Sequence, residues 1–219
     1  MTIEVHATKS VPFEILLATS NNGKIAELVD VFSALPVTLR LLKEFGNVVD
    51  VSEVGTTYEQ NAALKARGYF FQTGVPALAD DSGLEVDALD GKPGVFSARF
   101  GRAAFSNVER NDVLLKQLAQ VNSPLRTARF VCCMVLFGTP PGNLNASPDV
   151  LAVSRGVCEG RIANKPSGNG GFGFDPIFVP NGYDASFATL QPAIKGRISH
   201  RALAGEQMRK LLEIKLVET

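Results

Sequence analysis

The sequence predicts an α/β protein with a mixed β-sheet flanked by helices. Residues 14–42 run in the order short apolar strand, tight turn, amphipathic helix and second strand, which is typical of a right-handed βαβ unit with a parallel strand pair. Two runs rich in β-branched and aromatic residues, 127–137 and 150–159, flank a proline-rich loop and indicate an antiparallel hairpin. A sheet that contains both kinds of strand pair is mixed.

The first strand, 14–19, is an apolar run short enough to be buried on both faces of a sheet. Turn-forming residues at 20–23 lead into a helix predicted over 24–34, because apolar residues recur there at helical spacing. Pro36 ends this helix, and the second strand follows at 37–42.

Two capping boxes, each a Ser or Thr followed three residues later by Gln or Glu, mark the starts of the next helices. These helices are predicted over 57–73 and 106–121. The stretch between them holds two short strands, the first apolar and the second alternating apolar with acidic residues. The two strands are predicted at 77–80 and 84–88.

The rest of the chain supplies the central strand and the last helix. Residues 127–137 are the best candidate for the central strand, a brief strand is predicted at 176–179, and a helix is predicted over 199–217. No linker separates independent domains. We therefore predict one domain over 14–219, after an N-terminal extension over 1–13.

The composition excludes several classes of protein. The 219 residues carry 22 Lys and Arg against 22 Asp and Glu, so no net charge draws the chain to nucleic acid or to an anionic membrane. A hydrophobic fraction of 45% is enough for a large core and argues against disorder. The longest apolar stretch, 130–137, is too short for a membrane helix, and the first 13 residues lack the pattern of a signal peptide. Three cysteines without C-x-x-C spacing predict buried thiols, and we expect a cytoplasmic protein.

A candidate anion site lies where the first strand passes into the first helix. Free backbone N–H groups and the positive end of the helix dipole meet there, and a lysine adds a full charge, so a phosphate group suits the segment. Its sequence does not match the Walker A pattern, and by itself it also fits an ordinary turn. The segment consists of Thr19, Ser20, Asn21, Asn22, Gly23 and Lys24.

Two adjacent carboxylates, Asp80 and Asp81, stand at the predicted end of the 77–80 strand, followed by Ser82 and a glycine turn. Ligands of α/β proteins bind at strand ends. Two acids this close oppose each other's ionisation, which predicts either a raised pKa or bound Mg²⁺. Glu53, in a polar segment, is a candidate additional oxygen ligand. Adjacent strand residues face opposite sides, so spacing alone does not say which aspartate faces the site.

A glycine-dense segment near the C-terminal third could hold a flat base. Four glycines and two phenylalanines within 168–175 allow the backbone to approach a ligand while a ring stacks on it. Further along, Lys195, His200 and Arg201 bring positive charge and donors to the start of the last helix. Two helix starts suited to phosphate, oxygen ligands for Mg²⁺ and an aromatic platform together indicate a nucleoside polyphosphate site.

Five motifs occur in order over 17–203, and they carry a family resemblance. They are LATSNNGKIAEL, EVGTTYEQNAALKAR, ALADDSGLEVDALDGKPGVFSARF, GNGGFGFDPIF and KGRISHRAL. With them the chain resembles the inosine triphosphate pyrophosphatases, which hydrolyse inosine, deoxyinosine and xanthosine triphosphates to the monophosphate and pyrophosphate. The resemblance implies an elongated mixed sheet with two lobes around a central cleft, a homodimer and a requirement for Mg²⁺.

The same resemblance implies a role for each site residue. Residues 19–24 would hold the phosphates, Glu53 and Asp81 would hold the metal, Asp81 would also be the catalytic base, and Ser82 would contact the substrate. Ser20 stands where many relatives have glycine, which leaves the geometry of that loop open. The purine would be held by Phe172, Gly173, Phe174 and Asp175, with Lys195, His200 and Arg201 closing the site.

Base choice is expected to follow hydrogen-bond chemistry. Hypoxanthine and xanthine present a 6-oxo acceptor and an N1–H donor, whereas adenine presents the reverse. We expect Asp175 to accept from N1–H, and Arg201 to favour the 2-oxo group of xanthine over the 2-amino group of guanine. Two alternatives remain open: a nucleotide-binding regulator without turnover, and a pyrophosphatase for modified pyrimidine nucleotides.

Overall fold

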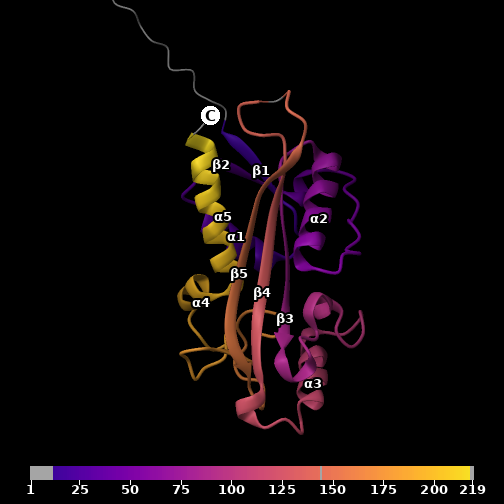
Figure 1. The fold of residues 1–219 in the computed structure, drawn as a ribbon, viewed down its shortest axis with the longest axis vertical. Helices are drawn as coiled ribbons and strands as arrows, with labels where there is room; N and C mark the ends of the chain where they lie inside the picture. Colours follow the sequence, from indigo (N-terminus) through magenta and orange to yellow (C-terminus); the bar gives the residue numbers. More distant parts are fainter. Residues whose placement is uncertain (1–11, 144, 218–219) are drawn as a thin grey trace, which may run out of the picture.

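The computed structural model describes residues 12–143 and 145–217 as a six-stranded sheet flanked by helices, with strand order β2-β1-β3-β4-β5-β6 (Figure 1). The sheet is mixed, as predicted: β1 runs parallel to β2 and β3, and the remaining pairs are antiparallel. The strands are β1 (Phe13–Leu17), β2 (Val37–Leu41), β3 (Ala77–Val86), β4 (Thr127–Gly138), β5 (Asp149–Ile162) and β6 (Phe178–Pro180). The α-helices are α1 (Asn22–Phe32), α2 (Tyr58–Thr73), α3 (Asn107–Gln117), α4 (Pro192–Ile198) and α5 (His200–Val217).

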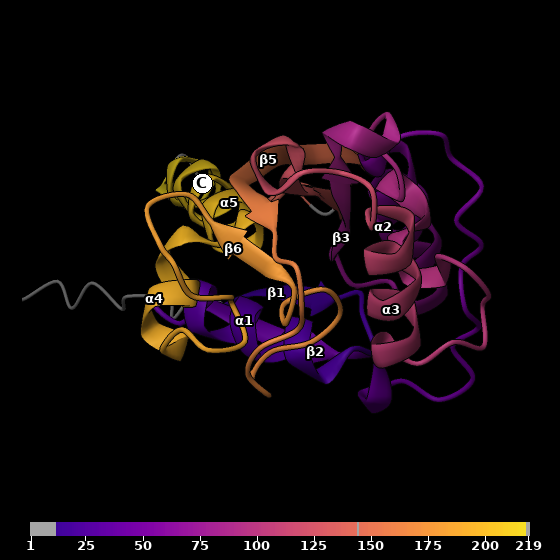
Figure 2. The same ribbon diagram turned by 90° about the horizontal axis from the view of Figure 1, so that it is seen from below.

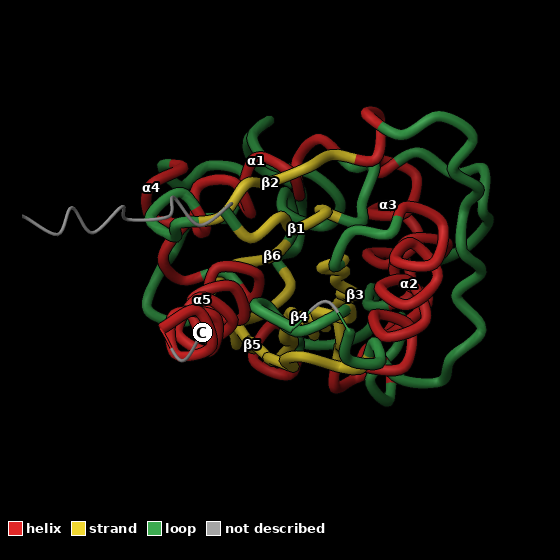
Figure 3. The backbone as a smooth tube through the Cα atoms, turned by 90° about the horizontal axis from the view of Figure 1, so that it is seen from above, coloured by secondary structure: helices red, strands yellow, loops and turns green. Residues whose placement is uncertain are grey.

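Alternation along the central strand divides the core between two faces. In β4, Met134 and Leu136 pack in the cluster that α1 and α5 cover, whereas Val135 and Phe137 pack in the cluster that α2 covers. Seen from either end, the strands follow a curve, with α2 and α3 on one side and α1, α4 and α5 on the other (Figure 2, Figure 3). At the far end of β3 and β4, α3 packs with residues of the 174–187 segment in a separate cluster.

β1, the strand that runs parallel to β3, covers only the start of it. The register pairs β1 with β3 only at Ala77 and Leu78, because the chain leaves the sheet after Leu17 and turns into α1. Within the described ranges, β3 then continues to Val86 with β4 as its one strand neighbour, apart from an isolated bridge between Glu85 and Pro93. Residues 92–97 cover the end of this edge, because the N–H of Val86 donates to Lys92 and the N–H of Leu84 donates to Ser97. No strand of the described residues lies beside the edge at 79–82, and side chains from both faces of β3 can reach the space there.

The predicted turn after Asp81 is wrong, because β3 is a single ten-residue strand where two short strands were expected. It pairs with β4 along its whole length, with Ser82 opposite Cys132 and Gly83 opposite Val131. Gly83 allows close packing and makes no turn, since a Cβ there would lie 2.2 Å from the carbonyl oxygen of Gly94.

Two further differences concern the C-terminal part. A separate helix, α4, precedes α5 and was not predicted; Pro192 favours its start, and Ser199 is extended and breaks it from α5. The brief strand β6 lies at Phe178–Pro180, shifted from the predicted 176–179. All three cysteines are buried free thiols, as expected.

Of the predicted N-terminal extension, residues 1–11 lie outside the described residues. In the part of the chain that is described, no helix has the length and apolar character needed to span a membrane.

Candidate active site

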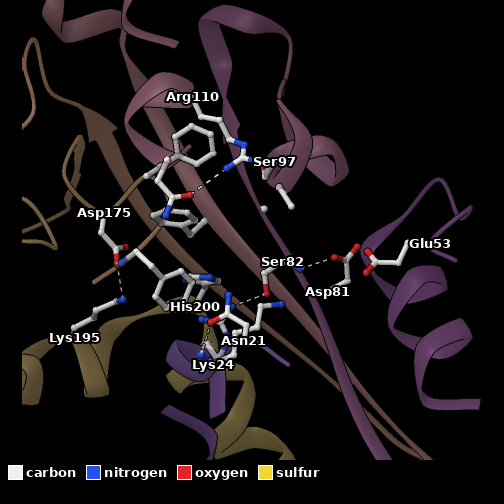
Figure 4. Close-up of a pocket in the computed structure, with 18 of the residues that line it drawn as sticks. Asn21, Lys24, Glu53, Asp81, Ser82, Ser97, Arg110, Asp175, Lys195 and His200 are labelled. Carbon is white, nitrogen blue, oxygen red and sulfur yellow. Dashed lines mark hydrogen bonds and ion pairs between the residues drawn. The ribbon is translucent and has the colours of Figure 1, made fainter. Parts of the chain in front are cut away.

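A cavity of about 360 Å³ lies beside Asp81, Ser82 and Gly83 of β3, with helices from both sides of the sheet around it (Figure 4). Most of the predicted site residues line it. They are Asn21, Lys24, Glu53, Asp81, Ser82, Phe172, Gly173, Phe174, Asp175, Lys195, His200 and Arg201. Four predicted residues do not line it: Thr19, Ser20, Asn22 and Gly23.

The expectation of free backbone N–H groups at the start of α1 is wrong for two of them. The side-chain oxygen of Asn21 accepts hydrogen bonds from the N–H groups of Gly23 at 2.9 Å and Lys24 at 3.2 Å. Asn21 is thus the N-cap of α1, and it satisfies donors that would otherwise lack a partner. Gly23 supports the site sterically, because a Cβ there would lie 2.7 Å from the Phe172 ring.

Asp80 is the buried counter-ion of two cations. Its carboxylate lies 3.0 Å from the Lys24 ammonium and 3.2 Å from Nε of Arg201, and it accepts a hydrogen bond from the Ser82 hydroxyl at 2.9 Å. Burial opposes ionisation of Asp80, but the charges of Lys24 and Arg201 outweigh it and hold its pKa below the usual range. Asp80 is therefore ionised at neutral pH.

Asp81 faces the other side of β3, toward α2. Its carboxylate accepts a hydrogen bond from the Asn61 amide at 3.0 Å and lies 3.8 Å from the Lys65 ammonium, which also pairs with Glu53 at 3.0 Å. Burial raises the pKa of Asp81, and the positive charge of Lys65 offsets this only in part. The result is a buried carboxyl group that faces the cavity and binds a proton more readily than an ordinary aspartate.

The glycine-dense segment positions an aromatic ring among charges. The Lys195 ammonium lies 4.8 Å from the centre of the Phe172 ring, and Cζ of Arg201 lies 5.6 Å from it. The Asp175 carboxylate accepts hydrogen bonds from Lys195 and from the backbone N–H of Phe172, each at 2.7 Å. Glu27 of α1 pairs with Lys195 at 2.9 Å and with Arg201 at 2.6 Å, which ties the ring's surroundings to α1.

His200 is buried and neutral in character. Its ring stacks on Phe130 of β4, with the ring centres 4.7 Å apart and the planes at 11°. Burial, with the nearby charges of Arg201 and Lys195, lowers the pKa of His200 well below the usual value. Its Nδ1 atom is buried and has no hydrogen-bond partner among the described residues.

The cavity includes functional candidates that the sequence analysis missed. Lys65 lies between the two predicted metal ligands, and a signal for it existed, because Asn61 and Lys65 are polar residues four apart within the buried stripe of α2. Glu27 was also missed, and it pairs with Lys195 and Arg201. Asp80, which spacing alone did not separate from Asp81, pairs with Lys24 and Arg201. The other lining residues that were not predicted are Gly83, Ser97, Ala98, Asn107, Arg110 and Phe130.

The protein has a curved mixed sheet, and a cavity lined by paired charges lies between helices from the two sides of that sheet. This is the α/β architecture that the family resemblance implied. The model of the Ham1 family matches residues 15–211, and the chain belongs to this family. This finding confirms the resemblance drawn from the five motifs.

Curated relatives and solved structures agree with this assignment. The dITP/XTP pyrophosphatase of Oceanobacillus iheyensis is 39% identical over 91% of this chain and 98% of its own length, and that of Thioalkalivibrio sulfidiphilus is 42% identical over 91% and 97%. A Ham1 protein structure from Coxiella burnetii matches with a TM-score of 0.81 at 39% identity, covering 92% of this chain and 99% of its own. The Staphylococcus aureus Ham1 protein matches with a TM-score of 0.78 at 35% identity, covering 91% of this chain and 98% of its own.

Proposed function

We propose that this protein is a Mg²⁺-dependent pyrophosphatase that hydrolyses dITP, ITP and XTP to the nucleoside monophosphate and pyrophosphate. The observation that carries the proposal is that one cavity contains both an acidic end, Glu53 and Asp81 around Lys65, and an aromatic end at Phe172. The name dITP/XTP pyrophosphatase, shared by the relatives, supports the choice of substrates.

The acidic end suits Mg²⁺. Glu53 and Asp81 already approach one cation, the Lys65 ammonium, from two sides. Magnesium in phosphate-handling sites is commonly held by one or two carboxylates, while water and substrate phosphates complete its octahedral shell. The described residues contain no group of three His, Cys, Asp or Glu able to hold a metal. Glu53 and Asp81 would therefore hold the ion jointly with the substrate.

The charge balance of the site supports a metal requirement. Five cations and five carboxylates line the cavity or pair with its lining residues, so the protein alone has little net charge to set against the four or so negative charges of a triphosphate. Bound Mg²⁺ would supply positive charge at the phosphates. The cations are Lys24, Lys65, Arg110, Lys195 and Arg201, and the carboxylates are Glu27, Glu53, Asp80, Asp81 and Asp175.

The side chains divide the hydrolysis between them. The oxygen of a water molecule attacks the α-phosphorus, the bond from this phosphorus to the oxygen that bridges to the β-phosphate breaks, and pyrophosphate leaves with the electron pair. Asp81, which faces the cavity beside the proposed metal position, accepts the proton of the water. Lys24, which pairs with Asp80 in the free protein, would bind the phosphates of the leaving group.

Base choice would depend on donors at the aromatic end. Phe172 would stack on the purine, and the Lys195 ammonium beside its ring would donate to a 6-oxo group. Asp175 and Glu27 already pair with this ammonium, so a 6-oxo group would accept its remaining N–H. The 6-amino group of adenine is itself a donor and would oppose that N–H, which disfavours adenine. Asp175 fixes Lys195 and has one oxygen committed to it, so its expected role toward N1–H stays a prediction.

Pyrophosphate release tests the proposal directly. The panel is ITP, dITP, XTP, ATP, GTP and a modified pyrimidine triphosphate, each with and without Mg²⁺. We expect fast release from the first three with Mg²⁺ only. Binding of ITP without release would indicate the regulator, and preference for the pyrimidine would indicate the other alternative. The homodimer, the cytoplasmic location and the lack of nucleic-acid binding stay predictions; size-exclusion chromatography with light scattering tests the first.

A further inference from the structure

Arg110 reaches the cavity from α3, on the side away from Lys24, and no motif of the sequence pointed to it (Figure 4). Its guanidinium is held at two nitrogens: Nη1 donates to the Asn107 side chain at 3.2 Å, and Nη2 donates to the carbonyl oxygen of Ala103 at 3.3 Å. Its Nε atom is buried and has no hydrogen-bond partner among the described residues. The two bonds use one N–H of each Nη atom, so a second N–H on each is left for a ligand in the cavity.

Neighbouring contacts bring this part of α3 against the segment that holds the base. The Asn111 amide, next to Arg110 in the chain, donates to the carbonyl oxygen of Gly173 at 3.3 Å. The rings of Phe100 and Phe174 meet edge to face, with their centres 6.5 Å apart. Arg110 is therefore positioned at the aromatic end of the cavity by contacts on both sides of it.

Arg201, the arginine expected to read the 2-position of the purine, is already engaged. Its Nε, Nη1 and Nη2 donate to Asp80, Glu27 and Ser82, and its side chain is only 2% exposed. Freeing those donors for a base would take one of two cations from each of Asp80 and Glu27, which is costly at the buried Asp80 carboxylate.

We propose that Arg110 is the specificity-determining residue for the 2-position of the purine. This inference rests on the proposed function and adds a ranking within it. A guanidinium donates hydrogen bonds and cannot accept them. It therefore binds the 2-oxo group of xanthine, is indifferent to the 2-hydrogen of hypoxanthine, and opposes the 2-amino group of guanine, which is also a donor. The cavity accepts XTP and refuses GTP through this one side chain.

The test compares kcat/KM for XTP, ITP and GTP in the wild type, in Arg110→Met and in Arg110→Gln. Methionine keeps the apolar stem and removes the donors, so we expect the XTP/ITP ratio of kcat/KM to fall roughly 10- to 100-fold. Glutamine offers an acceptor as well as donors, so the GTP/XTP ratio should rise further. Arg102→Met is the matched control, because Arg102 is exposed over the Phe105 ring and does not line the cavity.

The outcomes separate the two proposals. If the wild-type protein releases no pyrophosphate from ITP or XTP, the proposed function itself is overturned. An unchanged XTP/ITP ratio in both Arg110 variants, with ITP hydrolysis intact, overturns the role of Arg110 and leaves the proposed function standing. Equal loss on all three nucleotides also overturns it, since a general contact does not rank purines. If Arg110→Met fails to fold, two other measurements decide the question. One is the XTP/ITP ratio in Arg110→Gln, and the other is the affinity of the wild type for XMP and for IMP. Equal affinity for the two monophosphates counts against the proposal.

Discussion

Asp80 and Asp81 are neighbours in β3, yet one pairs with Lys24 and Arg201 and the other faces Lys65 on the opposite face of the strand. The open edge of β3 allows both to contribute to one site. Burial acts against ionisation of both; it is outweighed at Asp80, whose pKa is lowered, and it prevails at Asp81, whose pKa is raised. Two chemically identical side chains thus differ in their charge environment: Asp80 is a counter-ion, and Asp81 is the proposed proton acceptor.

Replacing the proton acceptor should abolish most activity. Asp81→Asn keeps the size of the side chain and removes its basicity, so kcat should fall by roughly 10²- to 10⁴-fold on ITP. Steady-state pyrophosphate release measures this, with Asp112→Asn on the exposed side of α3 as the control. A value of kcat within tenfold of the wild type would remove Asp81 from the proposed mechanism.

Replacing the counter-ion should affect folding first. Asp80→Asn removes the carboxylate that pairs with Lys24 and one of the two carboxylates that pair with the buried Arg201, Glu27 being the other. The unfolding free energy should fall by up to the roughly 3–5 kcal/mol that breaking a buried ion pair costs. Urea denaturation followed by circular dichroism measures the change. If Asp80→Asn unfolds at the same urea concentration as the wild type, Asp80 does not hold the two cations in place in solution.

Local patterns predicted most of the fold and part of the site. Residue periodicity and capping boxes located β4, the hairpin and α2, because these signals depend on nearby residues. The division between Asp80 and Asp81 could not be predicted, since it depends on cations from α1, α2 and α5 that meet only after folding. The glycine after Ser82 was interpreted as a turn because close packing against Gly94 leaves no local signal.

Lys65 should set the pH at which the proton acceptor becomes active. Its charge lowers the pKa of Asp81 from the still higher value that burial alone would give. In Lys65→Gln this pKa should rise further, and because the unprotonated form is the active one, kcat/KM should begin to fall at a higher pH as the solution is acidified. Profiles of kcat/KM from pH 5 to 9 show the shift, and Lys43→Gln at an exposed position is the control. If the acidic limbs of the kcat/KM profiles coincide in Lys65→Gln and the wild type, Lys65 does not control the pKa of Asp81.

Glu53 should control metal use and leave base choice unchanged. Glu53→Gln removes one of the two carboxylates proposed to hold Mg²⁺ at the acidic end of the cavity, so the Mg²⁺ concentration for half-maximal activity should rise roughly tenfold or more, as loss of a charged ligand weakens a divalent site. The ITP/ATP ratio of kcat/KM should stay within twofold, because Glu53 lies on the opposite side of the cavity from Asp175 and Lys195 (Figure 4). Mg²⁺ titrations with both nucleotides measure the two quantities. An unchanged Mg²⁺ requirement would mean that Glu53 is not a ligand.

His200 should make the fold less stable in weak acid. Its pKa in the folded protein lies well below that of an unfolded histidine, about 6.5, because it is buried beside Arg201 and Lys195. Protonation therefore favours the unfolded chain: the contribution to stability is complete above pH 6.5 and is lost as the pH falls toward the folded pKa, with a slope of up to about 1.4 kcal/mol per pH unit. The unfolding free energy of the wild type should fall between pH 7 and pH 5.5 more steeply than that of His200→Phe, which keeps a ring on Phe130. Urea denaturation at several pH values gives both slopes, and an NMR titration of the His200 ring reports its pKa separately. Equal slopes, together with a ring that titrates near pH 6.5, would show that this imidazole is hydrated and free to ionise, and the burial of His200 beside Arg201 and Lys195 would then not hold in solution.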